Sequence, residues 1–205
     1  MMQQLQRVFK MIRHQKALRG LVQSYFFFQE HTDKSSYGSI SEEDERGIER
    51  AIALAAPHAG PIIEVGTLFG HTTNLLAARK ATDKALIAIE NYAWNPFALP
   101  QEAHRLFLHR TLRYVREHAN VSIYEDDAAS FYRANASLRP SLIFIDAEHD
   151  YASVKRDIDW ALSVNCPVIA GHDYLPIHPG VCRAVEEAFG TEIEVYGSVW
   201  VHHRG

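Results

Sequence analysis

Short apolar segments alternate with amphipathic ones from residue 61 to residue 190, and this alternation predicts the class of fold. The apolar segments have the length of β-strands and cover Pro61–Thr67, Ala85–Asn91, Val121–Glu125, Leu142–Ala147 and Val168–Gly171. Between and after them, apolar residues recur at helical spacing near 71–80, 101–118, 128–136, 151–163 and 180–189. Strands and helices in turn indicate an open α/β sheet.

The character of the strands predicts their direction. Leu142–Ala147 begins with four consecutive apolar residues, as expected for a parallel strand that is buried on both faces of a sheet. The last two segments, Glu192–Tyr196 and Ser198–His202, instead alternate between apolar and polar residues around Gly197. This pattern predicts a β-hairpin appended to the parallel sheet.

A helix with a recognisable start precedes the first strand. Ser41 is followed three residues later by Asp44, as in a capping box, and Pro57 ends the helical pattern. We therefore divide the chain into an N-terminal helical extension over residues 1–40, which acts as a cap, dimer contact or partner contact, and a main domain over residues 41–205.

The N-terminal extension differs in charge from the rest of the chain. Residues 1–29 carry five basic and no acidic side chains, with apolar residues at helical spacing opposite them. Such a helix contacts a membrane surface or an anionic partner, or packs on its own domain or a second subunit. No apolar run is long enough to span a membrane. The apolar run over 21–28 would be unusual in contact with solvent, so its burial in a homo-oligomer is one alternative.

Composition excludes several classes of protein. The 205 residues, 47% hydrophobic and 22% charged, are typical of one globular domain. The net charge of −4 does not favour binding to nucleic acid. Cys166 and Cys182 are too few for a disulfide framework, so we expect a cytoplasmic protein. Twelve histidines are an unusually large number. Each can be a ligand, a base or a surface residue, and only its position distinguishes these roles.

The end of the first strand carries the first candidate site. Ligands of open α/β sheets bind at the carboxyl ends of the strands. Here Glu64 ends the strand, and Gly66 and Gly70 follow, four residues apart, before a helix. A dinucleotide fingerprint needs G-x-G-x-x-G and no competing acid. Glu64 suits a positively charged ligand better, such as the sulfonium and amino group of S-adenosylmethionine.

Acids also end the next two strands. Glu90 follows the second strand, where a carboxylate can accept both hydroxyls of a ribose. Asp126 and Asp127 follow the third strand, where a side-chain oxygen can accept from an adenine amino group, although adjacent acids also suit a solvated turn. These positions extend the candidate cofactor site.

The densest polar cluster follows the fourth and fifth strands. Asp146 and His149 come after the fourth strand, and His172 and Asp173 after the fifth. Neighbouring parallel strands lie about 4.8 Å apart, so these side chains can converge. They form either a divalent-cation site or a hydrogen-bonded structural network. Of the other histidines, His71 borders the glycine loop, and the remaining nine show no cluster in the sequence.

Taken together, these residues resemble a known family. The run from Glu64 to Thr73, the strand-end Glu90, the stretch I-D-A-x-H-x-Y-x-x-V-x-x-D over 145–157 and the stretch H-D-Y at 172–174 are similar to class I S-adenosylmethionine-dependent methyltransferases. The branch with the greatest similarity contains metal-dependent small-molecule and sugar O-methyltransferases. The resemblance covers residues 40–203. It implies a Rossmann-like, mostly parallel seven-stranded sheet with helices on both faces and a C-terminal antiparallel hairpin.

The resemblance also implies roles for individual residues. The cofactor S-adenosylmethionine would contact the following residues: Glu64, Gly66, Thr67, Gly70, Thr72, Glu90, Asp126 and Asp127. A divalent cation, Mg²⁺ or another, would bind Asp146, His172 and Asp173, with Asp146 also acting in catalysis. His149 would be the general base. His172 departs from the acid that is usual in such a ligand set, and Ala147 from a usual glycine.

Two other functions stay open at the level of sequence. A non-catalytic module of the same fold could bind a partner through the N-terminal segment, although the presence of Asp146, His149 and Asp173 together argues against it. A nicotinamide oxidoreductase is disfavoured by the glycine spacing. The methyl acceptor would be a small molecule, with Trp94, Tyr151 and Tyr174 as candidates for stacking on it.

Overall fold

The computed structural model describes residues 40–204. The N-terminal extension predicted over residues 1–40, with its basic helix and apolar run, therefore lies outside the described residues except for Ile40, which is buried against the domain. The helix predicted after Ser41 is α2 (Glu42–Ala55), and its capping box is present as expected.

Seven strands form one sheet in the order β3-β2-β1-β4-β5-β7-β6. The first five are parallel: β1 (Ile62–Val65), β2 (Leu86–Ile89), β3 (Val121–Tyr124), β4 (Leu142–Ile145) and β5 (Val168–Gly171). The C-terminal hairpin of β6 (Glu194–Tyr196) and β7 (Val199–His203) adds to β5 through β7, which runs antiparallel. The predicted fold class is confirmed, and the parallel strands are shorter than several of the apolar segments.

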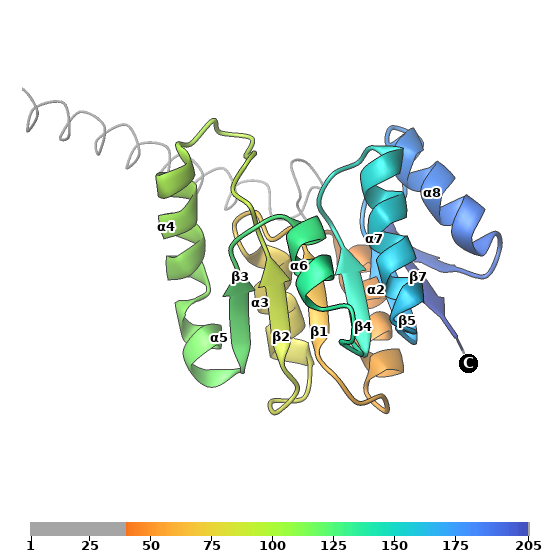
Figure 1. The fold of residues 1–205 in the computed structure, drawn as a ribbon, viewed down its shortest axis with the longest axis horizontal. Coiled ribbons are helices and arrows are strands. Elements are labelled where there is room, and N and C mark those ends of the chain that lie inside the picture. The colour runs from red at the N-terminus through yellow and green to blue at the C-terminus, as the bar shows by residue number, and fades with distance from the viewer. Residues whose placement is uncertain (1–39, 205) are drawn as a thin grey trace, which may run out of the picture.

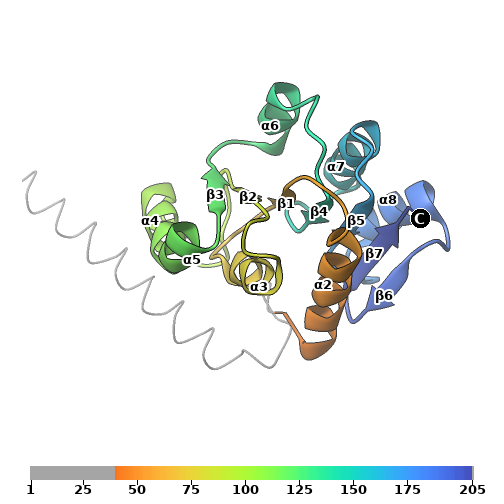
Figure 2. The same cartoon turned by 90° about the horizontal axis from the view of Figure 1, so that it is seen from below.

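Helices cover both faces of the sheet (Figures 1 and 2). α2, α3 (His71–Arg79) and α5 (Arg113–His118) lie on one face, whereas α6 (Ala128–Ala134), α7 (Tyr151–Ser163) and α8 (Pro179–Phe189) lie on the other. Two separate apolar cores fill the spaces beneath these helices. This double burial explains why β4 and β5 contain no exposed residue.

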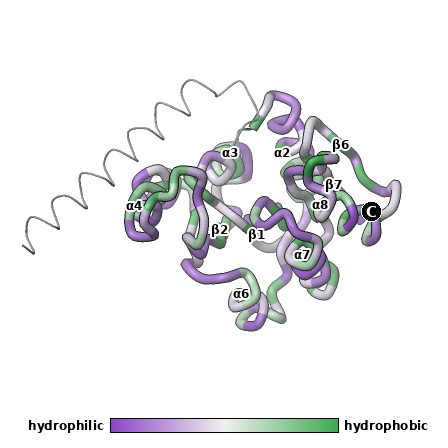
Figure 3. The backbone as a smooth tube through the Cα atoms, turned by 90° about the horizontal axis from the view of Figure 1, so that it is seen from above, coloured by the Kyte–Doolittle hydropathy of each residue, from purple (hydrophilic) through white to green (hydrophobic). Residues whose placement is uncertain are grey.

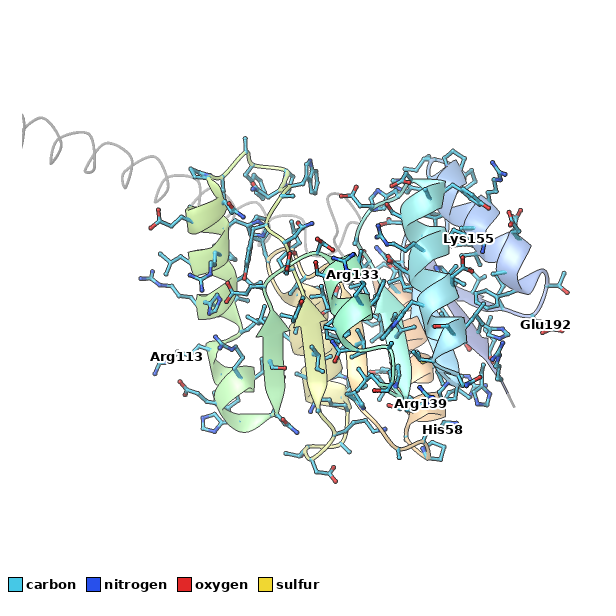
Figure 4. The ribbon with its side chains drawn as sticks, viewed as in Figure 1. His58, Arg113, Arg133, Arg139, Lys155 and Glu192 are labelled. Carbon is cyan, nitrogen blue, oxygen red and sulfur yellow. The ribbon has the colours of Figure 1, made fainter. Side chains whose placement is uncertain are left out.

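The outer surfaces of the helices are mostly polar, although Leu106 of α4 and Tyr114 of α5 are exposed. Hydrophilic and hydrophobic residues alternate along α4 (Gln101–Thr111) in Figure 3, as expected for a helix with one face on the protein. Arg113 of α5 and Arg133 of α6 extend outward in Figure 4, and both are exposed.

The helix predicted over 101–118 is divided in two. Leu112 leaves the helical conformation, with ψ near 2°, between α4 and α5. Its side chain is fully buried beside Gly70, where an added Cβ would lie 2.8 Å from Leu112 Cδ2. Packing against the loop after β1 therefore decides where this helix breaks, which periodicity alone does not show.

The order of the strands reverses between β1 and β4, which are neighbours in the sheet although six helices and strands lie between them in the sequence. Ligands of such sheets bind beyond the carboxyl ends of the strands at this reversal. The loops after β1, β2, β3, β4 and β5 all lie at that edge, the upper one in Figure 1.

Candidate functional site

The loop after β1 is pressed against the end of β4. The amide of Asp146 donates to the carbonyl oxygen of Val65 at 2.8 Å. Gly66 has a φ of +86°, and a Cβ there would lie 2.1 Å from the carbonyl oxygen of Asp146. The two strand ends approach so closely that no side chain fits at this position, which is why Gly66 is a glycine. The space next to Gly70 is likewise occupied by the chain itself.

Glu64 is fully buried beneath this loop. Its Oε2 accepts a hydrogen bond of 2.6 Å from the hydroxyl of Thr73, whereas Oε1 is buried without a hydrogen-bond partner. Burial raises the pKa of Glu64 well above its usual range, and the charges of Asp146 and Glu90 add to the rise. A buried carboxyl in this state gains charge stabilisation from a nearby cation. Thr73, which the sequence did not assign to the site, is the residue that contacts Glu64, whereas Thr72 is buried beside it in the first turn of α3.

Glu90 holds the loop after β1 in place. Its Oε2 accepts from the amides of Thr67 and Leu68 at 3.1 and 2.8 Å, and Oε1 accepts from the amide of Tyr92 at 2.7 Å. A carboxylate offers about four acceptor positions, so about one remains for a ligand hydroxyl. The hydroxyl of Thr67 itself contacts the carbonyl oxygen of Ile89.

A pocket of about 390 Å³ lies beyond the ends of β2 and β3. Residues of the loops and of α4 line it: Asn91, Tyr92, Gln101, Glu102, Arg105, Glu125 and Asp126. Asp126 is thus placed at a cavity of the size that a small molecule needs. Asp127 instead caps α6, because its Oδ1 accepts from the amide of Ser130 at 2.7 Å.

The predicted cation ligands do converge. Oδ1 of Asp146 and Oδ2 of Asp173 each lie 3.5 Å from Nδ1 of His172. Nδ1 is buried and has no hydrogen-bond partner at ordinary distance. A cavity of about 10 Å³ adjoins these three residues, which is about the space of one water molecule. Two carboxylates, an orphaned imidazole nitrogen and this small cavity fit a divalent cation.

His172 is oriented from behind by two residues that sequence reasoning did not assign to the site. Nε2 of His172 is 2.8 Å from the hydroxyl of Ser198, which donates to Oδ1 of Asp44 at 2.9 Å. Asp44 belongs to the capping box of α2, whose N-cap is Ser41. The capping box was visible in the sequence, but the link from Asp44 to His172 was not. Ser198 follows the hairpin turn at Gly197, and no sequence signal marks it.

Charges in the cluster are strongly coupled. Burial disfavours protonated His172, but Asp146, Asp173 and Asp44 outweigh burial and raise its pKa. Burial likewise opposes ionisation of Asp173, yet the hydrogen bonds from His149 and His172 lower its pKa far below the usual range. Without a cation, a protonated imidazole balances the carboxylates. A metal ion takes over this role only by displacing a proton.

His149 lies at the rim of the cluster. Its Nε2 is 2.8 Å from Oδ2 of Asp173, and its side chain is 45% exposed. The hydrogen bond to Asp173 raises the pKa of His149, although burial opposes the rise. The imidazole is therefore oriented by a carboxylate and open to a ligand, as a general base requires.

The sequence-based sorting of the histidines was wrong at several positions. His178 was assigned to no cluster, yet its Nε2 lies 3.7 Å from Oδ1 of Asp173. His104 is fully buried, and its Nε2 donates to the carbonyl oxygen of Leu68 at 2.6 Å. His109 contacts Glu125 at 2.8 Å. Each contact joins residues that are far apart in the chain, so local spacing could not reveal them.

Two of the predicted stacking residues are tied to α8. The hydroxyl of Tyr151 donates to Glu187 at 2.8 Å, and the guanidinium of Arg183 lies 4.2 Å from the centre of its ring. The hydroxyl of Tyr174 donates to Glu186 at 3.2 Å. Trp94 is different, because it is 64% exposed in the loop after β2. Of the three rings, that of Trp94 is the most available to a ligand.

A crossover α/β sheet with an acid-rich carboxyl edge and an antiparallel C-terminal hairpin defines a class of Rossmann-like domains. The family Methyltransf_24, described as a methyltransferase domain, matches residues 63–174. The chain therefore belongs to this family of methyltransferases.

Solved structures share the fold at low sequence identity. The O-methyltransferase from Bacillus cereus in complex with SAH is 17% identical, with a TM-score of 0.61 over 92% of this chain and 91% of that chain. The O-methyltransferase TomG from Streptomyces achromogenes, in complex with SAM, is 16% identical, with a TM-score of 0.58 over 91% and 90%. The calicheamicin methyltransferase CalS11 is 14% identical, with a TM-score of 0.62 over 79% of each chain.

No curated protein matches the sequence. Within residues 40–204, none of the helices has both the length and the apolar character that crossing a membrane requires.

Proposed function

We propose that this methyltransferase transfers a methyl group from S-adenosylmethionine to a hydroxyl oxygen of a small molecule, with a divalent cation bound by Asp146, His172 and Asp173. The observation that carries the proposal is the position of His149, 2.8 Å from Asp173 and beside the candidate cation ligands. A base and an electrophile next to each other suit deprotonation of a hydroxyl. Solved structures of this fold with SAM or SAH bound support the choice of cofactor.

The cofactor would extend along the carboxyl edge of the sheet. Glu64, with its orphaned Oε1, favours positive charge at the methionine end, next to Gly66 and Gly70. The remaining acceptor position of Glu90 suits a ribose hydroxyl. Asp126 lines the pocket of about 390 Å³ that would take the adenine. Asp127, the next residue, would contact the adenine from the start of α6.

Methyl transfer requires that the methyl group and the acceptor oxygen are aligned and that one proton is transferred. When bound, S-adenosylmethionine supplies the methyl group, and the cation lowers the pKa of the acceptor hydroxyl. His149 accepts the hydroxyl proton as the new carbon–oxygen bond forms and the carbon–sulfur bond breaks, which yields S-adenosylhomocysteine. Asp173 holds the imidazole of His149 and stabilises its protonated form. Orientation of the two reactants supplies much of the rate gain.

The proposal extends to assembly and location. Cys166 is buried and Cys182 is half-buried, and both are free thiols, which supports a cytoplasmic protein. We also propose a homo-oligomer or a peripheral contact through the basic segment over residues 1–29. That segment lies outside the described residues, so the charge pattern of the sequence supports this part of the proposal.

Ligand-dependent stability tests the proposal first. Titration of the full chain with S-adenosylhomocysteine, and separately with NAD, should raise the melting temperature with the former alone, since a ligand of the folded state stabilises it. Radiolabelled methyl transfer to a panel of phenols and sugars, with Mg²⁺, then tests catalysis, with His149→Ala as the inactive variant. Stabilisation by NAD alone would overturn the proposal. S-adenosylhomocysteine binding with equal transfer by His149→Ala would overturn the role of the base.

A further inference from the structure

His149, Asp173 and His178 form a second group of cation ligands, which shares only Asp173 with the first group. Nε2 of His149 is 2.8 Å from Oδ2 of Asp173, and Nε2 of His178 is 3.7 Å from Oδ1 of the same carboxylate. One ligand atom of each residue lies within 4.8 Å of the other two. All three side chains are partly exposed, at 45%, 18% and 24%, so an ion can reach them from solvent.

The backbone holds the two imidazoles together. Gly180, the second residue of α8, is so close to the loop after β4 that a Cβ there would lie 2.4 Å from the carbonyl oxygen of His149. The carbonyl of His178 accepts from the amides of Val181 and Cys182. The rings of His149 and His178 lie 4.3 Å apart between centroids. Close contact between the backbone segments that carry His149 and His178 thus brings the two imidazoles together.

The residue between the imidazoles has an unusual backbone conformation. Asp173 has a φ of +60°, which non-glycine residues rarely adopt. Such strain persists where the surrounding structure determines it, and it is frequent at ligand sites. In this conformation the carboxylate presents Oδ2 to His149 and His172 and Oδ1 to His178.

We propose that His149, Asp173 and His178 bind a divalent transition-metal ion of the Zn²⁺ type, at a second site that overlaps the site of Asp146, His172 and Asp173 only at Asp173. Imidazole nitrogens suit such ions, whereas Mg²⁺ prefers oxygen ligands. Ligands about 2.0–2.1 Å from a tetrahedral ion lie about 3.4 Å from one another. Nε2 of His149 is 2.8 Å from Oδ2 of Asp173, and Nε2 of His178 is 3.7 Å from Oδ1, so each imidazole nitrogen lies near this separation from its own oxygen of the carboxylate. Two imidazoles and one carboxylate leave a position open for water.

Occupation of this site has a functional consequence, which rests on the proposed function. A metal ion on Nε2 of His149 replaces the proton that this nitrogen donates to Asp173, and so removes the hydrogen bond by which Asp173 holds the base and stabilises its protonated form. Zn²⁺ would therefore inhibit methyl transfer supported by Mg²⁺. The binding itself does not depend on the function, so the experiment measures binding.

Equilibrium dialysis of the full chain against buffered Zn²⁺, followed by metal analysis, tests the site. The variants are His178→Gln, which removes a ligand of the second group alone, and Asp146→Asn, which removes a ligand of the first group alone. His118→Gln serves as the matched control, because His118 is an exposed histidine of α5. We expect His178→Gln to lose one Zn²⁺ or to bind it at least about tenfold more weakly, whereas Asp146→Asn and His118→Gln keep it.

Visible absorption of Co²⁺, used as a spectroscopic substitute for Zn²⁺, gives a second measurement. The wild type and Asp146→Asn should show the same ligand-field bands, and His178→Gln should lose them. Zn²⁺ binding that is unchanged in His178→Gln, or lost in Asp146→Asn alone, would overturn the proposal. Melting temperatures with S-adenosylhomocysteine, recorded for each variant, report folding and cofactor binding separately. A failure of the proposed function therefore remains distinguishable from a failure of the metal site.

Discussion

The hydroxyl oxygen of Ser198 lies 2.8 Å from Nε2 of His172, and it donates its own proton to Oδ1 of Asp44. Because the hydroxyl proton is used in this way, the oxygen accepts the proton on Nε2 of His172. Nδ1 is then the nitrogen that offers a lone pair toward Asp146 and Asp173 once it is deprotonated. Residues of α2 and of the C-terminal hairpin thus orient a candidate metal ligand that directly follows β5.

Replacement of Ser198 tests this arrangement. Ser198→Ala removes the acceptor for Nε2 and should weaken Mn²⁺ binding at the first cation site by about 10- to 100-fold, the usual effect of losing the partner of a metal-ligating histidine. Binding of S-adenosylhomocysteine should be unchanged, and calorimetry measures both. Ser130→Ala, which removes a hydroxyl on α6, is the control. Equal Mn²⁺ affinity in Ser198→Ala and the wild type would contradict the assignment.

Glu90 offers a test of the cofactor loop. Glu90→Gln keeps the shape of the side chain but replaces a charged acceptor of three amide hydrogen bonds by a neutral one. We expect the affinity for S-adenosylhomocysteine to fall by about tenfold, since hydrogen bonds to charged groups contribute about 1.5 kcal/mol or more. Calorimetric titration measures the change. Glu192→Gln, an exposed acid far from the loop (Figure 4), should bind like the wild type.

Removal of the divalent cation separates catalysis from cofactor binding. Treatment with a chelator should abolish methyl transfer, and Mg²⁺ should restore it, whereas the affinity for S-adenosylhomocysteine should not change. Asp146→Asn should behave like the metal-free enzyme, and added Mg²⁺ should not restore its activity, because the cation site has lost one ligand oxygen. Full transfer in the presence of the chelator would exclude a role of the cation in the reaction.

Asp157 provides a test of stability against pH. Burial raises its pKa from 3.8 to about 6, in opposition to the charge and hydrogen bond of Arg156. Between these two values the native state binds more protons than the unfolded state, so this group lowers the free energy of unfolding as pH rises from 4 to 6. The loss amounts to about 3 kcal/mol and is complete above pH 6.

The variant Asp157→Asn has no such titration. Urea unfolding of the wild type and the variant at pH 4, 5, 6 and 7 measures the difference between their free energies of unfolding. That difference should shift by about 3 kcal/mol in favour of the variant between pH 4 and 6, and then remain constant. Parallel curves over the whole range would show that Asp157 titrates at its ordinary pKa.

The sequence by itself determined the order of strands and helices and the acids at the strand ends. Four consecutive apolar residues in Leu142–Ile145 are sufficient to predict a strand buried on both faces, because each position faces a core whichever way it points. The parallel pairing of β4 with β5 then brings Asp146 next to His172 and Asp173. These features depend on local spacing and on the rules of sheet topology.

Only the tertiary structure decided which partners those residues have. Asp44 and Ser198 are 154 residues apart in sequence and meet because β7 inserts beside β5 under α2. Gly180 brings His178 to His149 through a close backbone contact between the start of α8 and the loop after β4. Thr73, which the sequence did not assign to the site, meets Glu64 because the first turn of α3 directs its hydroxyl to that carboxyl. Hydrogen bonds and ion pairs form over about 3 Å, and sequence spacing does not specify distance on that scale between remote segments.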